Sequence, residues 1–419
     1  MNTAARHTMR SHPVNPPGIE AHRIEFTGSG GEYFRVWIVN VLLSIVTLGL
    51  YTPWARRRTA QYFYGHTQVA GSPLEFVAEV RRMVFGFLII GAFWLAYKVA
   101  ADTGQHLAAS LLMFGFAVLA PFLWASAMRF RLGATRWRGI RLAFTARWKE
   151  VYVASWPVFA IAFIWIALIF LGAALSPELP AGVAGSPADA MGPPRLRLGG
   201  STLVLAGLAL ILTLLCVIRL EYNYRRLLVA RTRIGGQVGR WKPVYLDFVK
   251  VWLATALFFV LCIVGALGLL LVVTGGSTAL LSMILGERGN IGGFILLMIV
   301  LMLGLLLVFV LASLPARAYR EARMFQLVWN NVGFSHIARS KTSLRTGAFV
   351  WLRLKNLLLT LLTLGFYRPF AVASEYAAKV GSVTLYIKGG TDQLVGELVK
   401  QQGALGDAAA DMLGLDLIG

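Results

Sequence analysis

Long apolar runs alternate with short basic segments along most of this chain of 419 residues. A helix that crosses the roughly 30 Å hydrocarbon core of a bilayer needs about 20 apolar residues. Spanning segments must be helical, because an isolated strand would leave backbone groups unpaired in lipid. The runs of suitable length are Val84–Ala101, Leu107–Met128, Val151–Leu175, Ser201–Ile218, Val251–Thr274 and Ile291–Leu314. The pattern therefore predicts about six long spans.

Two further apolar segments resemble each other and are too short to cross comfortably. "VNVLLSIVTLGLYTPWA" begins at Val39 and "KNLLLTLLTLGFYRPFA" begins at Lys355. From Asn to Tyr each covers about 18 Å of helix. Arg353 and Lys355 would each cost about 2.5–3.5 kcal/mol at the bilayer midplane. We expect two half-length helices that are interfacial or re-entrant, rather than two further full spans.

Each half-length helix has a predicted end. Gly49 and Gly365 are expected to act as C-caps, and Pro53 and Pro369 to block continuation.

Lysine and arginine mark one side of the predicted bundle. Basic side chains concentrate in four segments, which run from Arg56 to Arg82, Arg129 to Lys149, Arg219 to Lys250 and Arg317 to Arg345. With six spans, all four segments lie on the same side, and basic loops near span ends stay cytoplasmic. We therefore expect both chain ends in the cytoplasm.

The basic segments also carry a repeated pattern. "TQVAGSPLEF" from Thr67 and "TRWRGIRLAF" from Thr135 share a Thr, then a Gly (Gly71, Gly139), then a Phe. Apolar and polar residues alternate after the glycine, which is typical of a half-buried strand, and glycine suits a tight turn with positive φ. With weaker copies from Thr232 and Asn330, the pattern predicts four short hairpins in a small cytoplasmic β-layer.

These patterns predict an all-α integral membrane fold. It would contain six long spans and two half-length helices, eight membrane helices in total, with short cytoplasmic β-hairpins between spans. The expected organisation is a disordered polar arm (1–23), a first motif block (24–83), the membrane bundle (84–314), a last motif block (315–390) and an acidic, small-residue tail (391–419).

Composition agrees with a membrane protein, since 57% of the residues are hydrophobic, 14% are charged and mean hydropathy is +0.67. Met1 to Ala21 is polar and lacks the apolar region of a signal peptide. Cys216 and Cys262 lie in predicted spans, where we expect small apolar residues rather than a disulfide framework.

The chain offers little conventional catalytic chemistry. None of its six histidines lies in a zinc-binding pattern such as HExxH. "GSGG" at Gly28–Gly31 lacks the spacing of a phosphate-binding loop. The spans contain almost no ionisable residues, which argues against transport coupled to protons or sodium. We expect no catalytic residue, no cofactor and no metal.

The net charge of +21 makes anionic lipid headgroups the expected partners, because each juxtamembrane Lys or Arg contributes about 1 kcal/mol to their attraction. Nucleic acid is not expected, since spans directly flank the basic segments. A protein partner or self-association is also considered. The candidate headgroup-binding residues are Arg56, Arg57, Arg58, Arg129, Arg131, Arg136, Arg138, Arg225 and Arg226.

The stretch from Glu25 to Gly71, "EFTGSGGEYFRVWIVNVLLSIVTLGLYTPWARRRTAQYFYGHTQVAG", resembles the opening of the YjgN family of bacterial multi-pass inner-membrane proteins, which contain a domain of unknown function. The second copy departs from it, with Phe370 in place of Trp54. The resemblance implies inner-membrane location and no established activity. Residues expected to maintain the motifs are Gly28, Gly49, Tyr51, Pro53, Trp54, Thr67, Gly71, Thr135, Gly139, Gly365 and Pro369.

Three function classes are compatible with the sequence. The favoured one is a non-enzymatic envelope protein that organises lipid or protein partners through its cationic cytoplasmic face. The second is a channel or uncoupled transporter for a small solute, lined by Asn40, Thr47, Asn356 and Thr363. The third and least favoured is a lipid-modifying membrane enzyme.

Overall fold

The computed structural model describes residues 19–175, 200–235, 237–273, 291–334, 338–389 and 395–396. Its strands form one 11-stranded sheet in the order β1-β11-β10-β9-β8-β7-β6-β5-β4-β3-β2. Their bounds are Ile19–Arg23 (β1), Glu25–Phe26 (β2), Thr67–Val69 (β3), Ser72–Phe76 (β4), Thr135–Trp137 (β5), Ile140–Phe144 (β6), Thr232–Ile234 (β7), Gln237–Trp241 (β8), Val332–Phe334 (β9), Ala338–Thr342 (β10) and Val383–Lys388 (β11).

The strands at the two ends of this order, β1 and β2, are consecutive in the sequence. Only Ile24 separates β1 from β2, and its backbone N–H donates to the Val383 carbonyl at 2.9 Å. β1 pairs antiparallel with β11, and β2 pairs antiparallel with β3. One extended segment thus joins the first and last strands, and the sheet closes into a ring.

The all-α fold class predicted from sequence is therefore wrong. Short hairpins do follow the repeated Thr and Gly pattern, but each also pairs with its neighbours through β4–β5, β6–β7, β8–β9 and β10–β11. An isolated hairpin is marginally stable in water, and pairing with neighbours on both sides stabilises each one. The outcome is a near-barrel sheet together with helices, rather than eight helices with separate hairpins.

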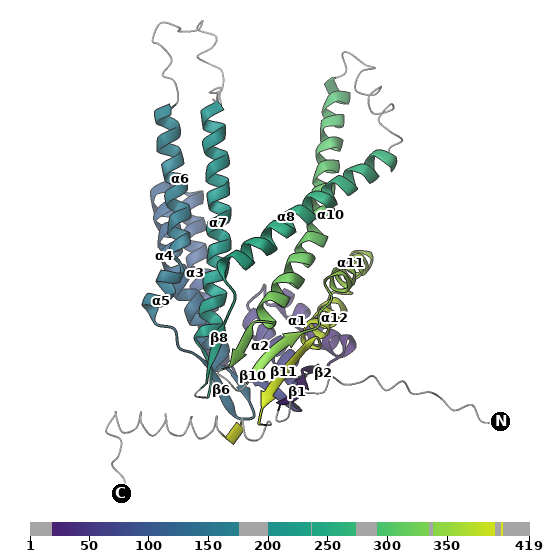
Figure 1. The fold of residues 1–419 in the computed structure, drawn as a ribbon. Coiled ribbons are helices and arrows are strands. Elements are labelled where there is room, and N and C mark those ends of the chain that lie inside the picture. The colour runs from purple at the N-terminus through teal and green to yellow at the C-terminus, as the bar shows by residue number, and fades with distance from the viewer. Residues whose placement is uncertain are drawn as a thin grey trace, which may run out of the picture.

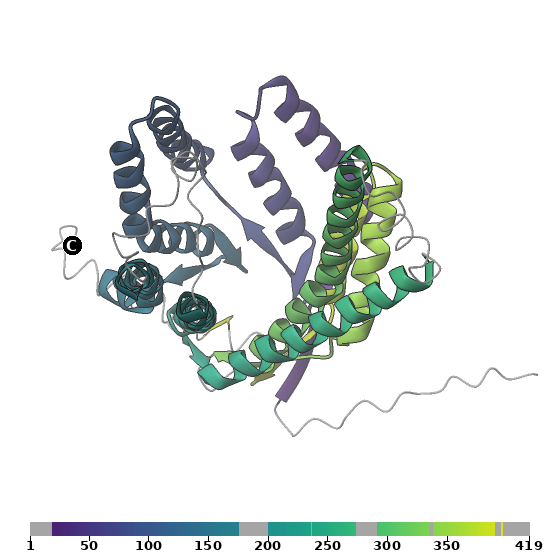
Figure 2. The same cartoon turned by 90° about the horizontal axis from the view of Figure 1, so that it is seen from above.

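Five similar units build the ring. In each unit a helical segment runs between two strands that pair with each other: β2 and β3, β4 and β5, β6 and β7, β8 and β9, and β10 and β11. The helices rise from one side of the sheet (Figure 1), and successive helical pairs follow one another around it (Figure 2). Their bounds are Gly30–Val46 (α1), Thr52–Gly65 (α2), Val80–Asp102 (α3), His106–Gly133 (α4), Trp148–Ala154 (α5), Trp156–Leu175 (α6), Gly200–Ala230 (α7), Tyr245–Val273 (α8), Ile291–Trp329 (α10), Thr346–Leu362 (α11) and Arg368–Val380 (α12).

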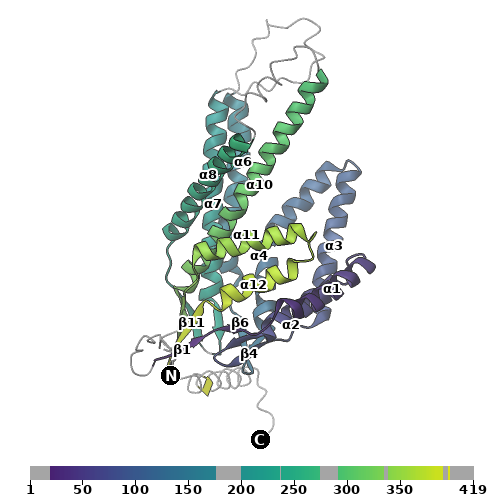
Figure 3. The ribbon, with the colours of Figure 1, turned by 90° about the vertical axis from the view of Figure 1, so that its right-hand side faces the viewer.

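The three middle units carry the long apolar helices. Among the described residues, five helices (α3, α4, α7, α8 and α10) are long and apolar enough to cross a membrane, and α5 with α6, bent by 41°, could form a sixth. These helices coincide with the six predicted spans, except that Thr274 lies outside the described residues. The first and last units instead carry short helical pairs, which run across the direction of the long helices (Figure 3).

A side-chain hydrogen bond marks the junction between helix and strand in successive units. The hydroxyls of Thr67, Thr135 and Thr232 each donate to the backbone carbonyl four residues earlier, at 2.6, 2.9 and 2.5 Å. In the fourth unit the Asn331 amide makes the same contact at 2.8 Å. The repeated Thr therefore satisfies a carbonyl at the end of one helix as the next strand begins.

Apolar side chains fill the inside of the ring. Ala70, Trp137, Ile140 and Ile387 form a buried cluster, although they come from strands and turns that are not all neighbours in the sheet. They must therefore meet across the ring. Successive residues of a strand point to opposite faces, so alternate positions face outward.

Candidate functional site

The short pair α1–α2 is closed by a tight reversal at its Thr-Leu-Gly sequence. The Gly49 N–H donates to the Ser44 carbonyl at 2.7 Å, and the Leu48 N–H donates to the Ile45 carbonyl at 3.1 Å. This is the hydrogen-bond pattern of a Schellman motif. Leu48, with φ of 50°, occupies the left-handed position where glycine is usual, and Gly49 follows with φ of 88°. Leu48 thus occupies the C′ position, and Gly49 occupies the following position, C″.

The pair α11–α12 repeats this reversal. Leu364 and Gly365 have φ of 50° and 96°, and the Gly365 N–H donates to the Thr360 carbonyl at 2.7 Å. Both reversals also use the predicted threonine. The Thr47 hydroxyl accepts from the Tyr51 N–H at 3.0 Å, and the Thr363 hydroxyl accepts from the Tyr367 N–H at 2.9 Å. These threonines are turn-forming residues at the tips.

Apolar side chains project from both tips. Leu48 is 93% exposed and Leu364 is 91% exposed, and neighbouring residues such as Val46 and Phe366 are also exposed. Exposed apolar side chains at the tip of a hairpin are suited to a lipid environment. Both leucines would be costly to hold in water.

The two prolines expected to stop the short helices instead begin the returning ones. Pro53 and Pro369 lie in the first turns of α2 and α12, where a missing N–H costs no helical hydrogen bond. Tyr51 stacks on Trp54 with ring centroids 6.1 Å apart, and Tyr367 stacks on Phe370 at 5.6 Å. The substitution of Phe for Trp in the second copy therefore keeps the aromatic contact.

Asn40 and Asn356 hold the helices of each short pair together. Asn40 is 6% exposed, and its amide donates to the Ala55 carbonyl at 3.3 Å. Asn356 is 2% exposed and donates to the Ala371 carbonyl at 3.3 Å and the Ser374 hydroxyl at 2.9 Å. These contacts lie within the hairpins, so neither amide is presented to a path through the long helices.

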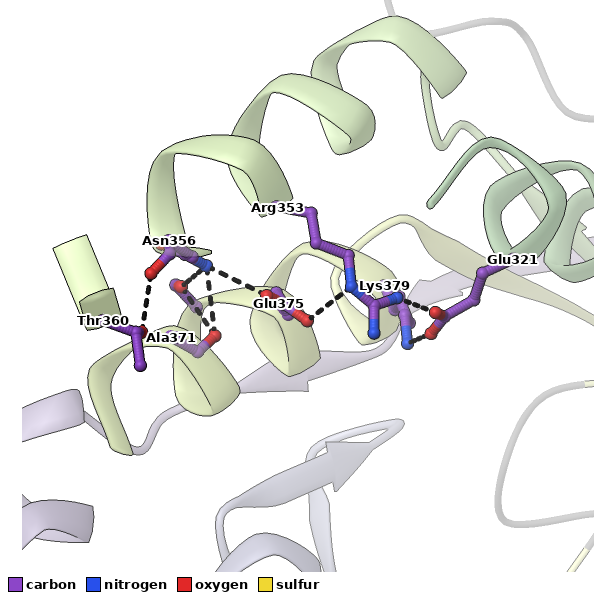
Figure 4. Close-up of polar contacts among 8 residues, drawn as sticks. Glu321, Arg353, Asn356, Thr360, Ala371, Glu375 and Lys379 are labelled. Atoms are coloured by element: carbon purple, nitrogen blue, oxygen red, sulfur yellow. Dashed lines mark hydrogen bonds and ion pairs between the residues drawn. The ribbon is translucent and has the colours of Figure 1, made fainter. Parts of the chain in front are cut away.

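A network of charges extends from Asn356 to the last long helix (Figure 4). The Asn356 amide also donates to Glu375 at 3.3 Å, and Arg353 lies 3.6 Å from the other oxygen of Glu375. Arg353 and Lys379 both contact Glu321 of α10. Burial lowers the pKa of Lys379, Arg353 lowers it further, and Glu375 opposes both effects. The network anchors the last short pair to the membrane bundle.

The first and last units pack against each other at the point where the ring closes. The Tyr376 hydroxyl of α12 donates to the Thr67 hydroxyl at 2.9 Å, because the Thr67 proton is already donated to the Phe63 carbonyl, and the Tyr376 ring lies 5.1 Å from that of Phe26. Gly30 permits this approach, because a Cβ there would lie 2.6 Å from a ring carbon of Phe370. The two short pairs are therefore one assembly rather than two isolated braces.

The segment containing Gly28 has a defined structural role. Ser29 caps α1 and exchanges hydrogen bonds with Glu32 in a capping box. The Tyr62 hydroxyl donates to the Ser29 carbonyl at 2.7 Å, and a Cβ at Gly28 would lie 2.7 Å from that hydroxyl oxygen. Burial raises the pKa of Tyr62 to about 12, and the Glu32 carboxylate acts in the same direction.

Gly71 and Gly139 have the predicted conformation. They have φ of 74° and 79°, and the residues before them, Ala70 and Arg138, also have positive φ. Two successive positive φ angles are typical of the type I′ turn that matches the twist of a hairpin.

Four of the nine candidate headgroup arginines are engaged within the protein, and one of them is Arg58, which donates to the Tyr51 hydroxyl at 3.3 Å. Arg129 donates to the Ala146 carbonyl at 2.7 Å and lies over the Trp148 ring at 3.6 Å. Arg138 donates to the Ser72 hydroxyl at 2.7 Å, and Arg225 pairs with Glu221 at 2.8 Å. Their first role is to connect strands and helices.

The candidate arginines are distributed over several units and are not gathered at one point. Arg56 and Arg58 are exposed on α2, whereas Arg57 is half-buried between them. The remaining three are Arg131 and Arg226, both exposed, and Arg136, half-buried. The sequence pattern correctly identified basic segments, but Glu321, Glu375 and Lys379 were missed because nothing in their local sequence connects them.

Comparison with known proteins identifies the family. Residues 21–412 match the family described as bacterial protein of unknown function, DUF898. The chain belongs to this family. Among curated proteins, inner membrane protein YjgN of Escherichia coli O157:H7 is 30% identical over 139 residues, which is 33% of this chain and 35% of the relative.

Two further curated relatives carry the same name. Inner membrane protein YjgN of Escherichia coli strain K12 is 29% identical over 136 residues, covering 32% of this chain and 34% of the relative. The protein of that name from Salmonella typhimurium is 25% identical over 153 residues, covering 36% and 38%. The matches thus span about a third of these relatives, and no solved structure matches.

The predicted membrane character and family are confirmed. Helices long enough to cross a bilayer are present, and the relatives are inner membrane proteins by name. The resemblance seen in the segment from Glu25 to Gly71 is thus a family relationship.

Proposed function

We propose that this protein is a non-enzymatic protein of the bacterial inner membrane that organises anionic lipids, and through them protein partners, at the cytoplasmic face. The ring of strands lies on that face, both chain ends are cytoplasmic, and the two short helical pairs enter the adjacent leaflet from the same side. The observation that carries the proposal is the combination, within one hairpin, of an apolar tip and exposed arginines.

The geometry of the first short pair supports simultaneous contact with lipid tails and headgroups. Leu48 projects from the tip, and burying a leucine side chain contributes about 1.5–3 kcal/mol. Arg56 lies four residues into α2, about 6 Å along the helix axis from its start. Because the short pair runs across the direction of the long helices (Figure 3), a tip that contacts lipid tails would leave Arg56 and Arg58 close to the phosphates.

Charge placement supports the sidedness. Exposed basic residues such as Arg131 and Arg226 lie at the ends of helices that lead into the ring. The turn from Asp102 to His106, at the opposite ends of α3 and α4, contains no lysine or arginine. Positive residues near span ends favour the cytoplasm, so the ring is the cytoplasmic end.

Lipid retention by the full-length protein tests the proposal. Arg56→Gln with Arg58→Gln removes two positive charges beside the tip. Arg141→Gln with Lys388→Gln removes the same charge from exposed strand positions near the hairpin turns, away from the helices. Each variant is purified in mild detergent, and phosphatidylglycerol and cardiolipin that remain bound are quantified by mass spectrometry.

The tip variant is expected to retain less than half of the anionic lipid bound by the parent protein, and the strand variant is expected to match the parent. Equal retention by the parent and the tip variant would contradict the proposal. A loss shared equally by both variants would also contradict it, because it would reflect net charge rather than the hairpin.

A further inference from the structure

A basic pocket of about 410 Å³ lies on the sheet, where β8, β9, β10 and β11 are neighbours. Its lining includes Arg240, Lys242, Arg339 and Lys341, and none of the described residues that line it is acidic. A volume of this size is typical of small-ligand sites. The pocket is separate from the nine arginines considered above and from the tips of the short helical pairs.

Strand register places two of the arginines on either side of a glycine. Gly333 of β9 pairs with Arg240 of β8 on one side and with Arg339 of β10 on the other. Residues paired directly across strands project from the same face, and two strand spacings separate the arginine backbones by about 10 Å. Both guanidinium groups can therefore reach a single group bound between them.

This face is the outer side of the ring. Ala338 and Ile387, which are adjacent in sequence to Arg339 and Tyr386, pack into the apolar cluster inside the ring. Because side chains alternate along a strand, Arg339 and Tyr386 point outward. Arg339 and Tyr386 are also paired across strands, so the Tyr386 hydroxyl belongs to the same row of outward side chains.

Gly333 lies between the two arginines and contributes only backbone atoms to the pocket lining. A Cβ at this position would lie 2.9 Å from the Ala338 carbonyl oxygen and 3.7 Å from the Cγ of Arg339. Any side chain there would strain the β9–β10 pairing and fill the space between the two guanidinium groups. The absence of a side chain at Gly333 therefore preserves the β9–β10 pairing.

A second pair of cations lies further along the same strands. Lys242 and Lys341 are two residues beyond Arg240 and Arg339, respectively, in the direction of the helices that follow β8 and β10. All four basic side chains are exposed. A ligand bound here would contact the guanidinium groups of Arg240 and Arg339, and the ammonium groups of Lys242 and Lys341 on the side nearer the helices.

We propose that this pocket binds a phosphate-bearing ligand. Guanidinium groups recognise phosphate oxygens through paired, charge-assisted hydrogen bonds, and lysine adds a mobile positive charge. The absence of acidic residues from the described lining favours a ligand with more than one negative charge. Two sources share this chemistry: a soluble diphosphate compound, or the headgroup of an anionic phospholipid.

The pocket does not depend on the function proposed above, because it uses different residues and a different face. Its test uses the full-length protein and two probes. Inorganic pyrophosphate represents the soluble source, and binding to detergent-purified protein is measured by isothermal titration calorimetry. Nanodiscs of phosphatidylcholine with and without phosphatidylglycerol represent the lipid source, with bound phosphatidylglycerol quantified after extraction.

The main variant is Arg240→Gln with Arg339→Gln, and Lys242→Gln with Lys341→Gln is a second variant at exposed positions. Arg141→Gln with Lys149→Gln, at exposed positions outside the pocket lining, is the matched control for charge. Removing two charge-assisted contacts is expected to weaken binding of at least one probe by about tenfold or more. The control is expected to leave pyrophosphate binding unchanged.

Weaker pyrophosphate binding in the pocket variants identifies a soluble phosphate ligand, whereas loss of phosphatidylglycerol alone identifies a lipid headgroup. The proposal is overturned if both pocket variants, folded by circular dichroism, bind both probes as the parent protein does. It is also overturned if the parent binds neither probe. A loss in the Arg141 and Lys149 control as large as in the pocket variants would reflect net charge and would also overturn the proposal.

Discussion

The two short helical pairs are similar in sequence, yet replacing the buried asparagine should have unequal effects on them. We predict that Asn356→Leu destabilises the protein by about 2 kcal/mol, whereas Asn40→Leu changes its stability by less than about 1 kcal/mol. The difference follows from the surroundings of each amide, since the helices and the apolar neighbours are otherwise alike.

The larger effect is expected at Asn356 because its amide has three acceptors. Two are the Ser374 hydroxyl at 2.9 Å and the carboxylate of Glu375 at 3.3 Å. A hydrogen bond to a charged group contributes about 1.5–3 kcal/mol, more than a neutral one. After the substitution the Ala371 carbonyl still accepts from the Ser374 hydroxyl, and Glu375 still pairs with Arg353. The loss of stability is therefore limited to about 2 kcal/mol.

A smaller effect is expected at Asn40 because its contacts are weaker. Its amide donates to the Ala55 carbonyl at 3.3 Å and to the Thr59 hydroxyl at 3.5 Å, and its own carbonyl oxygen is buried without a hydrogen-bond partner. A buried, unsatisfied polar atom costs about 1–3 kcal/mol. Leucine removes that cost while it removes the two bonds, so the two changes largely cancel.

Unfolding in mixed micelles measures the difference. Each variant is titrated with sodium dodecyl sulfate in mild detergent, and helix content is followed by circular dichroism. A difference of about 1.4 kcal/mol between the two variants corresponds to tenfold in the unfolding equilibrium. Equal destabilisation by both substitutions, or a greater effect at Asn40, would refute the assignment of their hydrogen bonds.

Three further predictions concern contacts outside these amides. Glu321→Gln should reduce stability by about 1–2 kcal/mol in the same detergent titration, because it weakens the contacts of Arg353 and Lys379 at a partly exposed site. Tyr62 has a folded pKa of about 12 against an ordinary 10.0, so the stability that it contributes below pH 10 is lost as pH rises from 10 to 12. In Tyr62→Phe the unfolding midpoint should therefore depend less on pH between 10 and 12 than it does in the parent protein. Thr232→Val should lower thermal stability by about 1 kcal/mol, because it removes the 2.5 Å bond at the end of α7, and an unchanged melting temperature would count against that role.

The sequence predicts the spans and the local hairpins because both depend on local patterns. Hydropathy over about 20 residues marks a spanning helix, and the alternation after Gly71 or Gly139 marks a strand. The pairing between hairpins has no such signal. Leu142 of β6 pairs with Ile234 of β7, for example, although a complete helical unit separates them in the sequence.

The closure of the ring could not be predicted from the sequence for a related reason. Ile19–Arg23 reads "IEAHR" and lies in a segment expected to be a disordered polar arm, yet it forms β1 against β11. Its partner strand is at the other end of the chain, and the hydrogen-bonding groups of the backbone do not depend on side-chain pattern. A polar sequence can therefore close a sheet without showing clear alternation.

The short helical pairs were predicted in part. The Thr-Leu-Gly sequence marks the end of each first helix, whereas Pro53 and Pro369 begin α2 and α12 and do not end the helices before them. Asn40 and Asn356 were identified as polar groups among apolar ones. Their partners lie across a reversal of the chain, so the sequence alone could not show that they bond within the hairpin.

Thiol labelling in intact cells tests the central claim most directly, namely that the ring and the bases of both short helical pairs lie on one side of the membrane. Single cysteines at Gln105, Glu75 and Leu48 are introduced after Cys216→Ala and Cys262→Ala, and a membrane-impermeant maleimide is applied from outside. The account predicts labelling of Gln105→Cys, in the turn between α3 and α4, and protection of Glu75→Cys until the membrane is permeabilised. Leu48→Cys should not be labelled from outside. External labelling of either the Glu75 or the Leu48 position would contradict the one-sided ring and its partly inserted tips.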